Sequence, residues 1–471
     1  MTLSTATPEF LNALEAALPA GVLSEVPAHY LTEPRDLHHG AAAILARPRA
    51  VEEVATIVTM CNRYNVGIIP YAGGTGLVGG QVANLDPAPV LLSVERMTAV
   101  RNIDIANNTI TVEAGVILED VQTAADQVDR LFPLSLAAQG SCRIGGNLAT
   151  NAGGVQVLRY GNTRDLCLGL EAVMPDGSIY RGLSGLRKDN TGYDLRNILV
   201  GSEGSLGIIT AATLKLFAKP KEVATAMAVV ASPAAAVELL GDIQDKLDGL
   251  VSSFELINGV GLDFLAAEMP DVRQPFKERP TWMVLLEVTS GLGAALETRL
   301  ISALETAIEN GLVLDVLIAQ NIQQRQEFWQ VRESIPLANK SVGSISSHDI
   351  SVPISAIPTF IETGAKAIAK LGDFRINCFG HVGDGNLHYN VYPALGKSAQ
   401  DMANLRETVK DMVYGLVHDC GGSFSAEHGV GRYKLVDLEK YGDPTKLAMI
   451  RSIKAALDPK GIMNPGVIVR Q

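Results

Sequence analysis

Two histidines and a Glu-His pair are the side chains in this chain whose types and spacing best suit chemistry. His381 and His388 flank a Gly-Asp-Gly turn within CFGHVGDGNLHYN, and Glu427 and His428 follow in a second segment, SAEHGVG. Two imidazoles and one carboxylate form a three-ligand metal site that leaves positions open for water or substrate. We therefore predict His381, His388 and Glu427 as metal ligands and His428 as a group that moves a proton.

The spacing between the two histidines would place them on one face of a helix, but the residues between them oppose that. Gly383, Asp384 and Gly385 disfavour a helix and favour a strand, a tight turn and a second strand. Asp384 has ligand chemistry, yet its position between two glycines favours a turn-former that bonds its own backbone. Zn²⁺ suits the predicted ligands best, and Mn²⁺ or Fe²⁺ could occupy the same two-His, one-carboxylate site.

Three glycine-rich segments in the first half of the chain suggest a second kind of ligand. They are GGTGLVGG at 73–80, GSCRIGGNLATNAGG at 140–154 and GSEGSLG at 201–207. The first contains G-x-G-x-x-G, but no helix follows it and no Lys-Ser/Thr completes a phosphate loop, so neither a Rossmann fingerprint nor a Walker A motif fits. Small residues still let a backbone approach a pyrophosphate. A tight surface loop explains one such segment, whereas three predict a long, extended cofactor.

Composition limits the class of protein. The 471 residues are 47% hydrophobic and 19% charged, with a formal net charge of −12, which suits a large globular chain and argues against nucleic acid or an anionic membrane surface as a partner. The five cysteines contain no CxxC pair, which disfavours a disulfide framework and an iron–sulfur cluster and predicts a reducing, cytoplasmic compartment. We expect neither a signal peptide nor a transmembrane segment.

The hydrophobic periodicity predicts elements that place these motifs in two successive units. Helices are expected over 50–65, 117–131, 233–246, 294–309, 321–340 and 400–418. Strands are expected over 66–70, 89–94, 109–114, 208–217, 226–231, 251–256, 282–289 and 312–318, with a β-hairpin over 168–181. The first unit lacks the regular alternation of a doubly wound sheet. From 223 onwards we expect an α+β domain with helices on one face of its sheet.

In order along the chain, PYAGGTGLVGG, GSCRIGGNLATNAGG, GSEGSLGIIT, HVGDGNLH, SAEHGVG and the terminal NPG resemble the motifs of a known family. They are similar to the FAD-binding D-2-hydroxy-acid dehydrogenases, whose FAD domain is of the vanillyl-alcohol-oxidase (PCMH) type. This branch includes D-lactate dehydrogenases, D-2-hydroxyglutarate dehydrogenases and a glycolate oxidase flavin subunit. The resemblance implies an α+β chain with an FAD-binding domain at 1–220, a substrate (cap) domain with an antiparallel sheet at 221–420, and a segment at 421–471 that packs back on the flavin site.

The resemblance also implies which residues hold the flavin. Gly73, Gly74, Thr75, Gly76 and Leu77 would bind the pyrophosphate. The rest of the cofactor would meet Gly140, Ser141, Gly145, Gly146, Asn147, Gly153, Gly154, Ile208, Ile209 and, from the C-terminal segment, Asn464. Members with covalently bound flavin carry a histidine where this chain has Thr75, so we expect non-covalent FAD.

A mechanism follows from these parts. A 2-hydroxy acid chelates the metal through its carboxylate and hydroxyl, which lowers the hydroxyl pKa, and His428 takes the proton as general base while hydride leaves for the flavin. The family favours the D enantiomer. By resemblance, Arg332 binds a substrate carboxylate, and Asn390 is a further substrate contact. The alternative for Arg332 is a surface salt bridge.

Two departures from the family pattern bear on substrate length. Where the D-2-hydroxyglutarate enzymes have a Thr and a Lys that assist the arginine, this chain has Pro336 and Ser347. Losing a charged hydrogen bond to a buried carboxylate costs about 1.5–3 kcal/mol. This favours a substrate without a second carboxylate, such as D-lactate.

The other functions that stay open are a D-2-hydroxyglutarate dehydrogenase, the flavin subunit of a glycolate oxidase with a separate iron–sulfur partner, and a metal-binding module or zinc hydrolase without flavin. The sequence does not identify the electron acceptor, and a quinone, a cytochrome and an electron-transfer flavoprotein all stay open. The oligomeric state is open, with a homodimer among the options. We expect a cytoplasmic protein, or one peripheral to the inner membrane through its acceptor.

Overall fold

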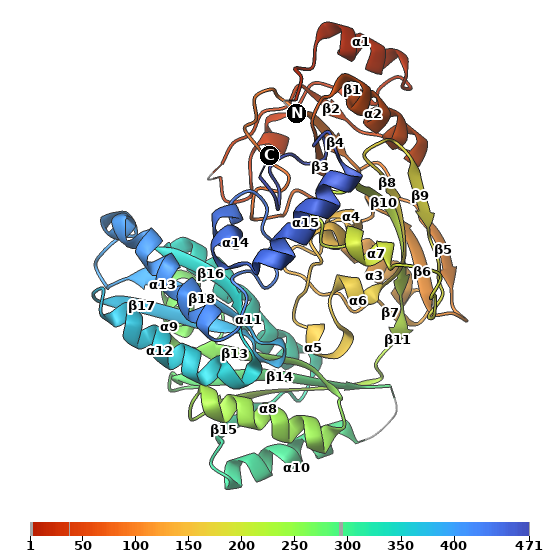
Figure 1. Cartoon of the computed structure of the whole chain (residues 1–471). Helices are drawn as coiled ribbons and strands as arrows, with labels where there is room; N and C mark the ends of the chain where they lie inside the picture. Colours follow the sequence, from red (N-terminus) through yellow and green to blue (C-terminus); the bar gives the residue numbers. More distant parts are fainter. Residues whose placement is uncertain (1–2, 37, 292–294, 471) are drawn as a thin grey trace. The chain divides into compact units, whose positions relative to one another are not determined.

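The computed structural model describes residues 3–36, 38–291 and 295–470. The chain divides into two compact units, each built from segments that are separate in the sequence (Figure 1). Unit 1 comprises Met1–Gly153, Asn162–Ala218 and His428–Gln471, and unit 2 comprises Gly154–Gly161 and Lys219–Glu427.

The last boundary lies at 427/428 rather than at the predicted 420/421, because local contacts hold residues up to Glu427 on unit 2. Ser423 forms a β-bridge with Ser351, and the Ala426 N–H donates to the carbonyl of Asp349. The Glu427 N–H donates to Asp349 Oδ2 at 2.9 Å. The metal-ligand candidate Glu427 is therefore the final residue of unit 2, and His428 begins the last segment of unit 1.

A short insertion from the first half of the chain also belongs to unit 2. Its helix α5 (Val157–Tyr160) is held by Arg159, whose Nη1 donates to the carbonyls of Leu250 at 3.3 Å and Thr289 at 2.5 Å. Gly154, predicted to line the flavin, therefore lies in unit 2 and not with the other glycines.

Unit 1 contains two main sheets. A four-stranded sheet has the order β1 (Leu23–Ser24), β2 (Ile44–Ala46), β4 (Val90–Ser93), β3 (Ile68–Tyr71), and its last three strands are parallel. Helix α2 (Val51–Tyr64) packs its buried stripe of Val54, Ile57, Val58 and Cys61 against this sheet. The helix and the strand that leads into the first glycine loop therefore share one hydrophobic core.

The second sheet of unit 1 is antiparallel, in the order β5 (Val100–Asp104), β6 (Thr109–Glu113), β10 (Ile208–Lys215), β8 (Cys167–Val173), β9 (Ile179–Gly182). The remaining elements of this unit are α1 (Pro8–Ala16), η1 (Ala28–Leu31), α3 (Leu118–Asp126), β7 (Arg130–Leu131), α4 (Ile144–Ala149), α6 (Thr163–Leu166), α7 (Leu195–Leu199), β11 (Phe217–Ala218), α14 (Leu435–Tyr441) and α15 (Pro444–Leu457). The helix predicted over 117–131 ends at Asp126, since Asp129 adopts a left-handed φ of 55° before β7.

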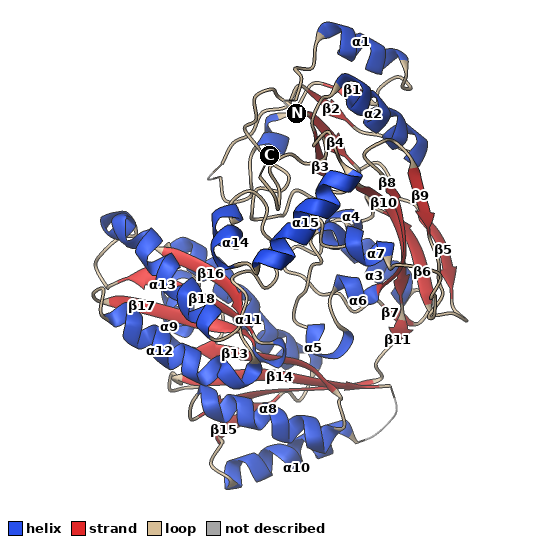
Figure 2. Ribbon diagram, in the orientation of Figure 1, coloured by secondary structure: helices blue, strands red, loops and turns tan. Residues whose placement is uncertain are grey.

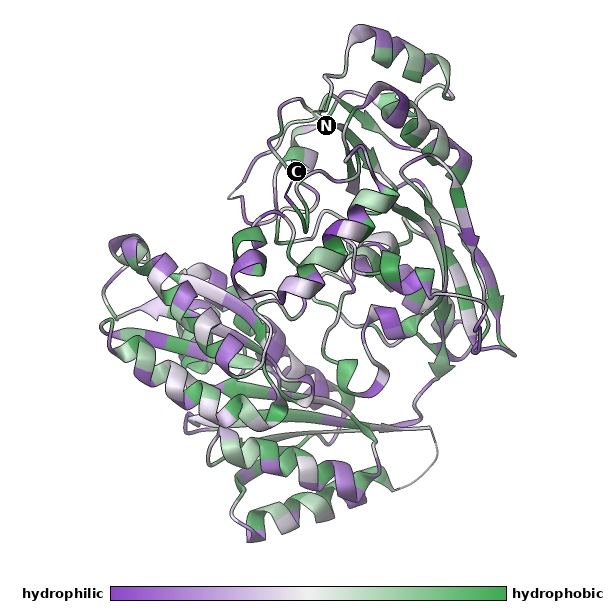
Figure 3. Cartoon of the chain, viewed as in Figure 1, coloured by the Kyte–Doolittle hydropathy of each residue, from purple (hydrophilic) through white to green (hydrophobic). Residues whose placement is uncertain are grey.

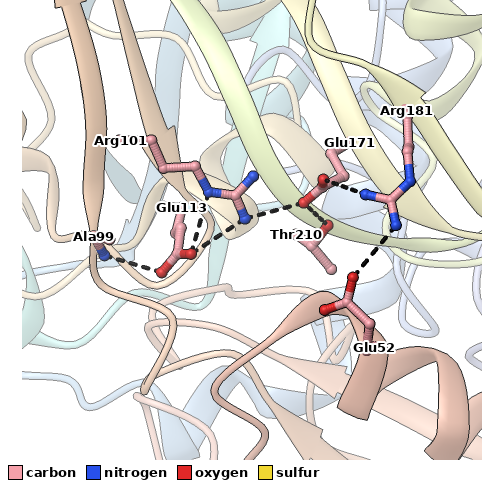
Figure 4. A network of polar contacts seen from close by, with 7 residues as sticks. All are labelled: Glu52, Ala99, Arg101, Glu113, Glu171, Arg181 and Thr210. Atoms are coloured by element: carbon pink, nitrogen blue, oxygen red, sulfur yellow. Dashed lines mark hydrogen bonds and ion pairs between the residues drawn. The ribbon is translucent and has the colours of Figure 1, made fainter.

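A polar network crosses the antiparallel sheet (Figure 4). The buried carboxylate of Glu171 on β8 accepts hydrogen bonds from Arg101 on β5 at 3.1 Å and from the Thr210 hydroxyl on β10 at 3.0 Å. Arg181 on β9 lies 3.7 Å from the same carboxylate and reaches Glu52 on α2 at 3.3 Å. The network compensates a buried charge and connects the antiparallel sheet to the helix of the neighbouring sheet.

Unit 2 is built on a seven-stranded antiparallel sheet. Its order is β15 (Val313–Ile318), β12 (Glu222–Val230), β14 (Trp282–Ser290), β13 (Val251–Asn258), β17 (Phe374–His381), β18 (Asn386–Pro393), β16 (Ser346–Ser351). Figure 3 shows hydrophobic colours along its central strands and banded colours on the helices that cover them. Strands β13 and β17 pair at Glu255–His381 and Leu256–Gly380, which places a predicted metal ligand beside a glutamate.

Helices cover both faces of this sheet, not one face as predicted (Figure 2). Helices α8 (Pro233–Leu247), α10 (Leu296–Glu309), α12 (Ile357–Ala369) and α13 (Arg406–Asp419) form one layer. On the other face, α9 (Gly259–Glu268) and α11 (Ile322–Val342) pack together on the sheet. The 3-10 turns η2 (Ile354–Ala356), η3 (Val382–Asp384) and η4 (Gln400–Leu405) complete the unit.

Helix α9 was missed because Gly259 and Gly261 at its start are typical of a loop.

None of the described helices is long and apolar enough to cross a membrane.

Candidate functional site

The two predicted histidine ligands lie on either side of the turn in a strand–turn–strand motif, as predicted. His381 ends β17, the turn η3 follows, and β18 carries His388. Gly385 closes the turn at a φ of +83°, and a Cβ there would overlap the carbonyl oxygen of Val352. The side chain of Asp384 accepts the Asn386 N–H at 3.1 Å, so this aspartate stabilises the turn as expected.

His381, His388 and Glu427 come together in unit 2. Each offers one ligand atom, and these atoms lie within 4.8 Å of one another. His381 Nε2 is 3.6 Å from Glu427 Oε1, and the two imidazole rings are 5.6 Å apart at an interplanar angle of 79°. Two nitrogen donors and one carboxylate within this distance fit Zn²⁺, Mn²⁺ or Fe²⁺, with coordination positions left for substrate.

Behind His381 lies a glutamate that the sequence analysis did not single out. Glu255 is fully buried on β13, and its Oε1 is 2.6 Å from His381 Nδ1. This contact assigns the Nδ1 proton to the Glu255 hydrogen bond, so a metal ion would displace the proton on Nε2 and bind there. Burial opposes charge on both groups, but the charge of His381, together with that of Arg332, lowers the pKa of Glu255 to about 2. Burial likewise lowers the pKa of His381, and the charge of Glu255 outweighs it and raises that pKa to about 9.

The other oxygen of the same glutamate binds Arg332. Glu255 Oε2 accepts hydrogen bonds from Arg332 Nε at 2.9 Å and Nη2 at 2.8 Å. The arginine is 5% exposed, so the interpretation as a surface salt bridge is wrong and the ion pair is buried. The Arg332 guanidinium lies 4.8 Å from the centre of the Phe379 ring, and the His388 ring packs on the same phenylalanine at 4.9 Å. Glu255 thus connects Arg332 to His381, and Phe379 packs against both Arg332 and His388.

The remaining predicted substrate contacts lie across the same strands. Asn390 follows His388 by two residues on β18, so both side chains point to one face of the sheet. Its register partners are Ser347 on β16 and Asn377 on β17. Ser347 is exposed, with its hydroxyl 2.6 Å from that of Ser344, and Pro336 is exposed on α11. Pro336 and Ser347, the two departures from the family pattern, are therefore both exposed positions.

The segment that begins with His428 is held in unit 1 by a second buried glutamate. Glu203 Oε1 accepts the Val430 N–H at 2.8 Å, and Oε2 accepts the Gly431 N–H at 2.7 Å. Gly429 has a φ of +82°, and a Cβ there would lie 2.7 Å from Glu203 Oε1. Burial, only partly offset by these two hydrogen bonds, raises the pKa of Glu203 to about 6. Gly429 of SAEHGVG thus leaves the space that the carboxylate of Glu203 in GSEGSLG occupies.

The first two glycine loops meet in unit 1, as their predicted common role requires. A Cβ at Gly73 would lie 2.6 Å from the carbonyl oxygen of Ser141, and one at Gly146 would lie 3.1 Å from Ala72 Cβ. The Gly145 N–H donates to the carbonyl of Ala114 at 2.8 Å, which packs the start of α4 on the end of β6. Backbone contacts this close are open only to residues without side chains.

The third glycine loop and the C-terminal segment join the same assembly. The amides of Gly201 and Glu203 donate to carbonyls at the end of α4. Asn464 Nδ2 donates to the carbonyls of Glu203 at 2.7 Å and Gly80 at 3.0 Å, and its Oδ1 accepts from Arg432 Nη2 at 2.7 Å. Asn464 is 2% exposed, and its three hydrogen bonds connect the first loop, the third loop and the C-terminal segment.

The first loop fits the pyrophosphate of a dinucleotide. Over the described ranges of the chain, the backbone N–H groups of residues 73–77 donate to no protein acceptor. Gln81 Nε2 donates to the carbonyls of Gly74 at 3.3 Å and Gly76 at 2.7 Å, which engages the oxygens of the loop and leaves its amides available. Such a run of amides is a cradle for an anion. Ile208 and Ile209 begin β10, and both are buried.

Glycine loops with available backbone amides in unit 1 and a cluster of metal-capable side chains in unit 2 are compatible with a flavin-dependent oxidoreductase. The family model described as FAD linked oxidases, C-terminal domain, matches residues 219–468, and the FAD binding domain model matches residues 42–182. The chain belongs to the FAD-linked oxidase family, with an FAD domain of the vanillyl-alcohol-oxidase (PCMH) type.

The chain is also similar in sequence to individual named enzymes. The chain is 35% identical over 429 residues to the mitochondrial D-2-hydroxyglutarate dehydrogenase of Arabidopsis thaliana, covering 91% of this chain and 75% of that one. It is 36% identical over 453 residues to the D-2-hydroxyglutarate dehydrogenase of Xanthomonas citri pv. viticola, covering 94% of each.

Solved structures share the fold. Substrate-bound p-cresol methylhydroxylase is 16% identical with a TM-score of 0.76, covering 98% of this chain and 97% of that one. An alkyldihydroxyacetonephosphate synthase is 19% identical with a TM-score of 0.73, covering 99% of this chain and 86% of that one.

Proposed function

We propose that this protein is an FAD- and metal-dependent dehydrogenase that oxidises a D-2-hydroxy acid to the 2-oxo acid. The observation that carries the proposal is the cluster of His381, His388 and Glu427, whose ligand atoms lie within 4.8 Å of one another in a chain with an FAD-binding domain. The names of the relatives, D-2-hydroxyglutarate dehydrogenases at about one-third identity, support the same reaction class.

When bound, FAD accepts the hydride, and the metal, with zinc as our first candidate, polarises the substrate's hydroxyl and carboxylate. The side chains of the protein do the rest. Arg332 supplies a fixed positive charge, which favours a carboxylate in a chain whose net charge is −12. His428 takes the hydroxyl proton, a role that suits an imidazole near neutral pH. Asn390 orients the substrate from the strand that carries His388.

The test is a panel of D- and L-2-hydroxy acids with a dye as electron acceptor, with and without a chelator. We expect activity on D-acids only, lost on metal removal and restored by added Zn²⁺ or Mn²⁺. His388→Ala should abolish the activity, whereas His418→Ala, an exposed histidine on α13, should leave it unchanged. Activity on L-acids alone, or full activity without metal, contradicts the mechanism, and a purified protein without flavin colour contradicts the whole proposal.

For substrate length, our first candidate is a short acid such as D-lactate, because Pro336 and Ser347 replace two groups that would assist a second carboxylate. The second candidate is D-2-hydroxyglutarate, which the names of the relatives favour. The ratio of kcat/KM for the two acids decides between them. The glycolate oxidase flavin subunit remains a third option, which glycolate in the same panel tests.

A gain-of-function variant tests the role of Ser347. Ser347→Lys places a charge beside Asn390 across the β16–β18 pair and should raise kcat/KM for D-2-hydroxyglutarate by about tenfold, the equivalent of one charged hydrogen bond. Ser341→Lys, an exposed serine on α11, is the matched control and should change neither acid. A wild-type enzyme that already prefers the dicarboxylate would rule out the short-acid candidate.

We also propose that electrons leave the flavin to an external acceptor, a quinone, a cytochrome or an electron-transfer flavoprotein. The chain has no paired cysteines for a cluster of its own.

A further inference from the structure

Two buried glutamates on adjacent strands of unit 2 have the same general environment. Glu255 lies on β13 and Glu287 on β14, at 0% and 2% exposure. Each is paired with an arginine of helix α11, Glu255 with Arg332 and Glu287 with Arg325. The two arginines are seven residues apart and so lie on one face of the helix. By burial and by charge, the two glutamates are a matched pair.

They differ in what else they bind. Glu287 Oε2 accepts from the Thr225 hydroxyl at 2.9 Å and from Trp329 Nε1 at 2.9 Å, and neither group has metal chemistry. The second oxygen of Glu255 instead meets His381 Nδ1 at 2.6 Å. Strand pairing places Glu255 directly opposite His381, so the backbone register holds this contact as well as the side chains do.

We propose that Glu255 is a positioning residue for two groups that bind the substrate, the metal ion and Arg332. It orients His381 as a metal ligand and holds Arg332 beside it. One oxygen orients the imidazole with Nε2 towards Glu427, and the other holds the guanidinium over Phe379. A carboxylate that receives the distal N–H of a metal-bound histidine orients that ligand and strengthens it as a donor. This inference rests on the proposed metal site and adds that one carboxylate connects it to Arg332.

The test compares the isosteric variants Glu255→Gln and Glu287→Gln of the full-length flavoprotein, with metal affinity as the readout. Competition of Zn²⁺ between the protein and a chromophoric chelator should give an affinity about 10- to 100-fold weaker in Glu255→Gln. Glu287→Gln should bind Zn²⁺ as the wild type does, even though it neutralises a glutamate that is buried as deeply and is also paired with an arginine of α11. A general loss of packing would affect the two variants alike, so the difference isolates the contact with His381.

A second variant covers the case in which Glu255→Gln fails to fold because Arg332 is left as an uncompensated buried charge. Glu255→Gln combined with Arg332→Met removes both charges, and its Zn²⁺ affinity should stay as weak as that of the single variant. Wild-type affinity in either variant overturns the role of Glu255 while leaving the metal site in place. A wild-type protein that binds no Zn²⁺, Mn²⁺ or Fe²⁺ overturns the proposed metal and this inference together.

Discussion

At the scale of single residues, the contact between Glu255 and His381 makes the stability of the metal-free protein depend on pH. The pKa of His381 rises from 6.5 to about 9 in the folded chain, so its proton stabilises the fold. This contribution is complete below pH 6.5 and is lost as pH rises through about 9. It amounts to at most about 3.4 kcal/mol at about 1.36 kcal/mol per pKa unit. Urea unfolding of chelator-treated protein between pH 6.5 and 9 should therefore show falling stability.

Glu255→Gln is the control for this prediction, because it removes the charge that raises the pKa of His381 and should flatten the curve. With saturating metal the trend should weaken or reverse, since the metal displaces the His381 proton and binds more tightly at higher pH. Constant or rising stability of the metal-free wild type across the window would show that the pair is not charged.

The burial of Arg332 leads to a second prediction at this scale. Arg332→Ala leaves Glu255 buried with one of its two partners, and breaking a buried pair in this way costs about 3–5 kcal/mol. Arg325→Ala on the same helix should cost clearly less, because that arginine's side chain is 39% exposed and Glu287 keeps Thr225 and Trp329 as partners. Urea midpoints of the two variants measure the difference. Equal losses would mean that Arg332 is no more buried in solution than Arg325.

The sequence analysis singled out the three candidate metal ligands but not the glutamate behind His381, for a physical reason. His381, His388 and Glu427 lie in motifs whose residue types already limit their chemistry. Glu255 lies in the apolar strand VSSFELIN, and its signal is only a charge within a buried strand. Glu287, in WMVLLEVTS, carries the same signal. Strand register and helix α11 decide which of the two reaches a histidine, and both depend on tertiary structure.

At the scale of elements, the glycine loops of unit 1 depend on one asparagine. Asn464 connects the first loop at Gly80, the third loop at Glu203 and the C-terminal segment at Arg432. Asn464→Ala removes three hydrogen bonds worth about 1 kcal/mol each, so the FAD dissociation constant should rise by roughly 10- to 100-fold. Fluorescence of flavin released on dilution measures this. Asn310→Ala, an exposed position at the end of α10, should leave it unchanged. Wild-type flavin retention in Asn464→Ala would show that the loops hold their shape without this clamp.

Many of the longer elements could be predicted from periodicity, whereas helices α9, α12 and α15 were not predicted. The strand–turn–strand motif of the histidines and the helix α2 follow from local sequence alone. Helix α9 was missed because its glycines are local breakers, and they are tolerated because the backbone packs closely there: a Cβ at Gly261 would lie 3.0 Å from Asn377 Oδ1. The second face of the sheet, which α9 covers with α11, was therefore missed as well.

At the scale of the whole molecule, segments distant in sequence are combined within each unit. The C-terminal residues from His428 onwards belong to unit 1 with the glycine loops, and the insertion Gly154–Gly161 belongs to unit 2. The resemblance to a family gave the order of the domains. The return of the C-terminal segment to unit 1 depends on contacts such as those of Glu203 with Val430 and Gly431. These contacts join residues far apart in the chain, so no local sequence pattern reveals them.

This division predicts that the two ligands are held independently. His381, His388 and Glu427 all lie in unit 2, whereas residues 73–77, Ser141 and Asn464 lie in unit 1. Dialysis against a chelator should therefore remove the metal and abolish turnover of a D-2-hydroxy acid while the flavin absorbance per protein stays at its starting value. Removal of the flavin in high salt should conversely leave the metal content, measured by atomic spectroscopy, unchanged. Release of flavin in step with metal would mean that the metal stabilises the glycine loops of unit 1. The two units would then not bind their ligands independently.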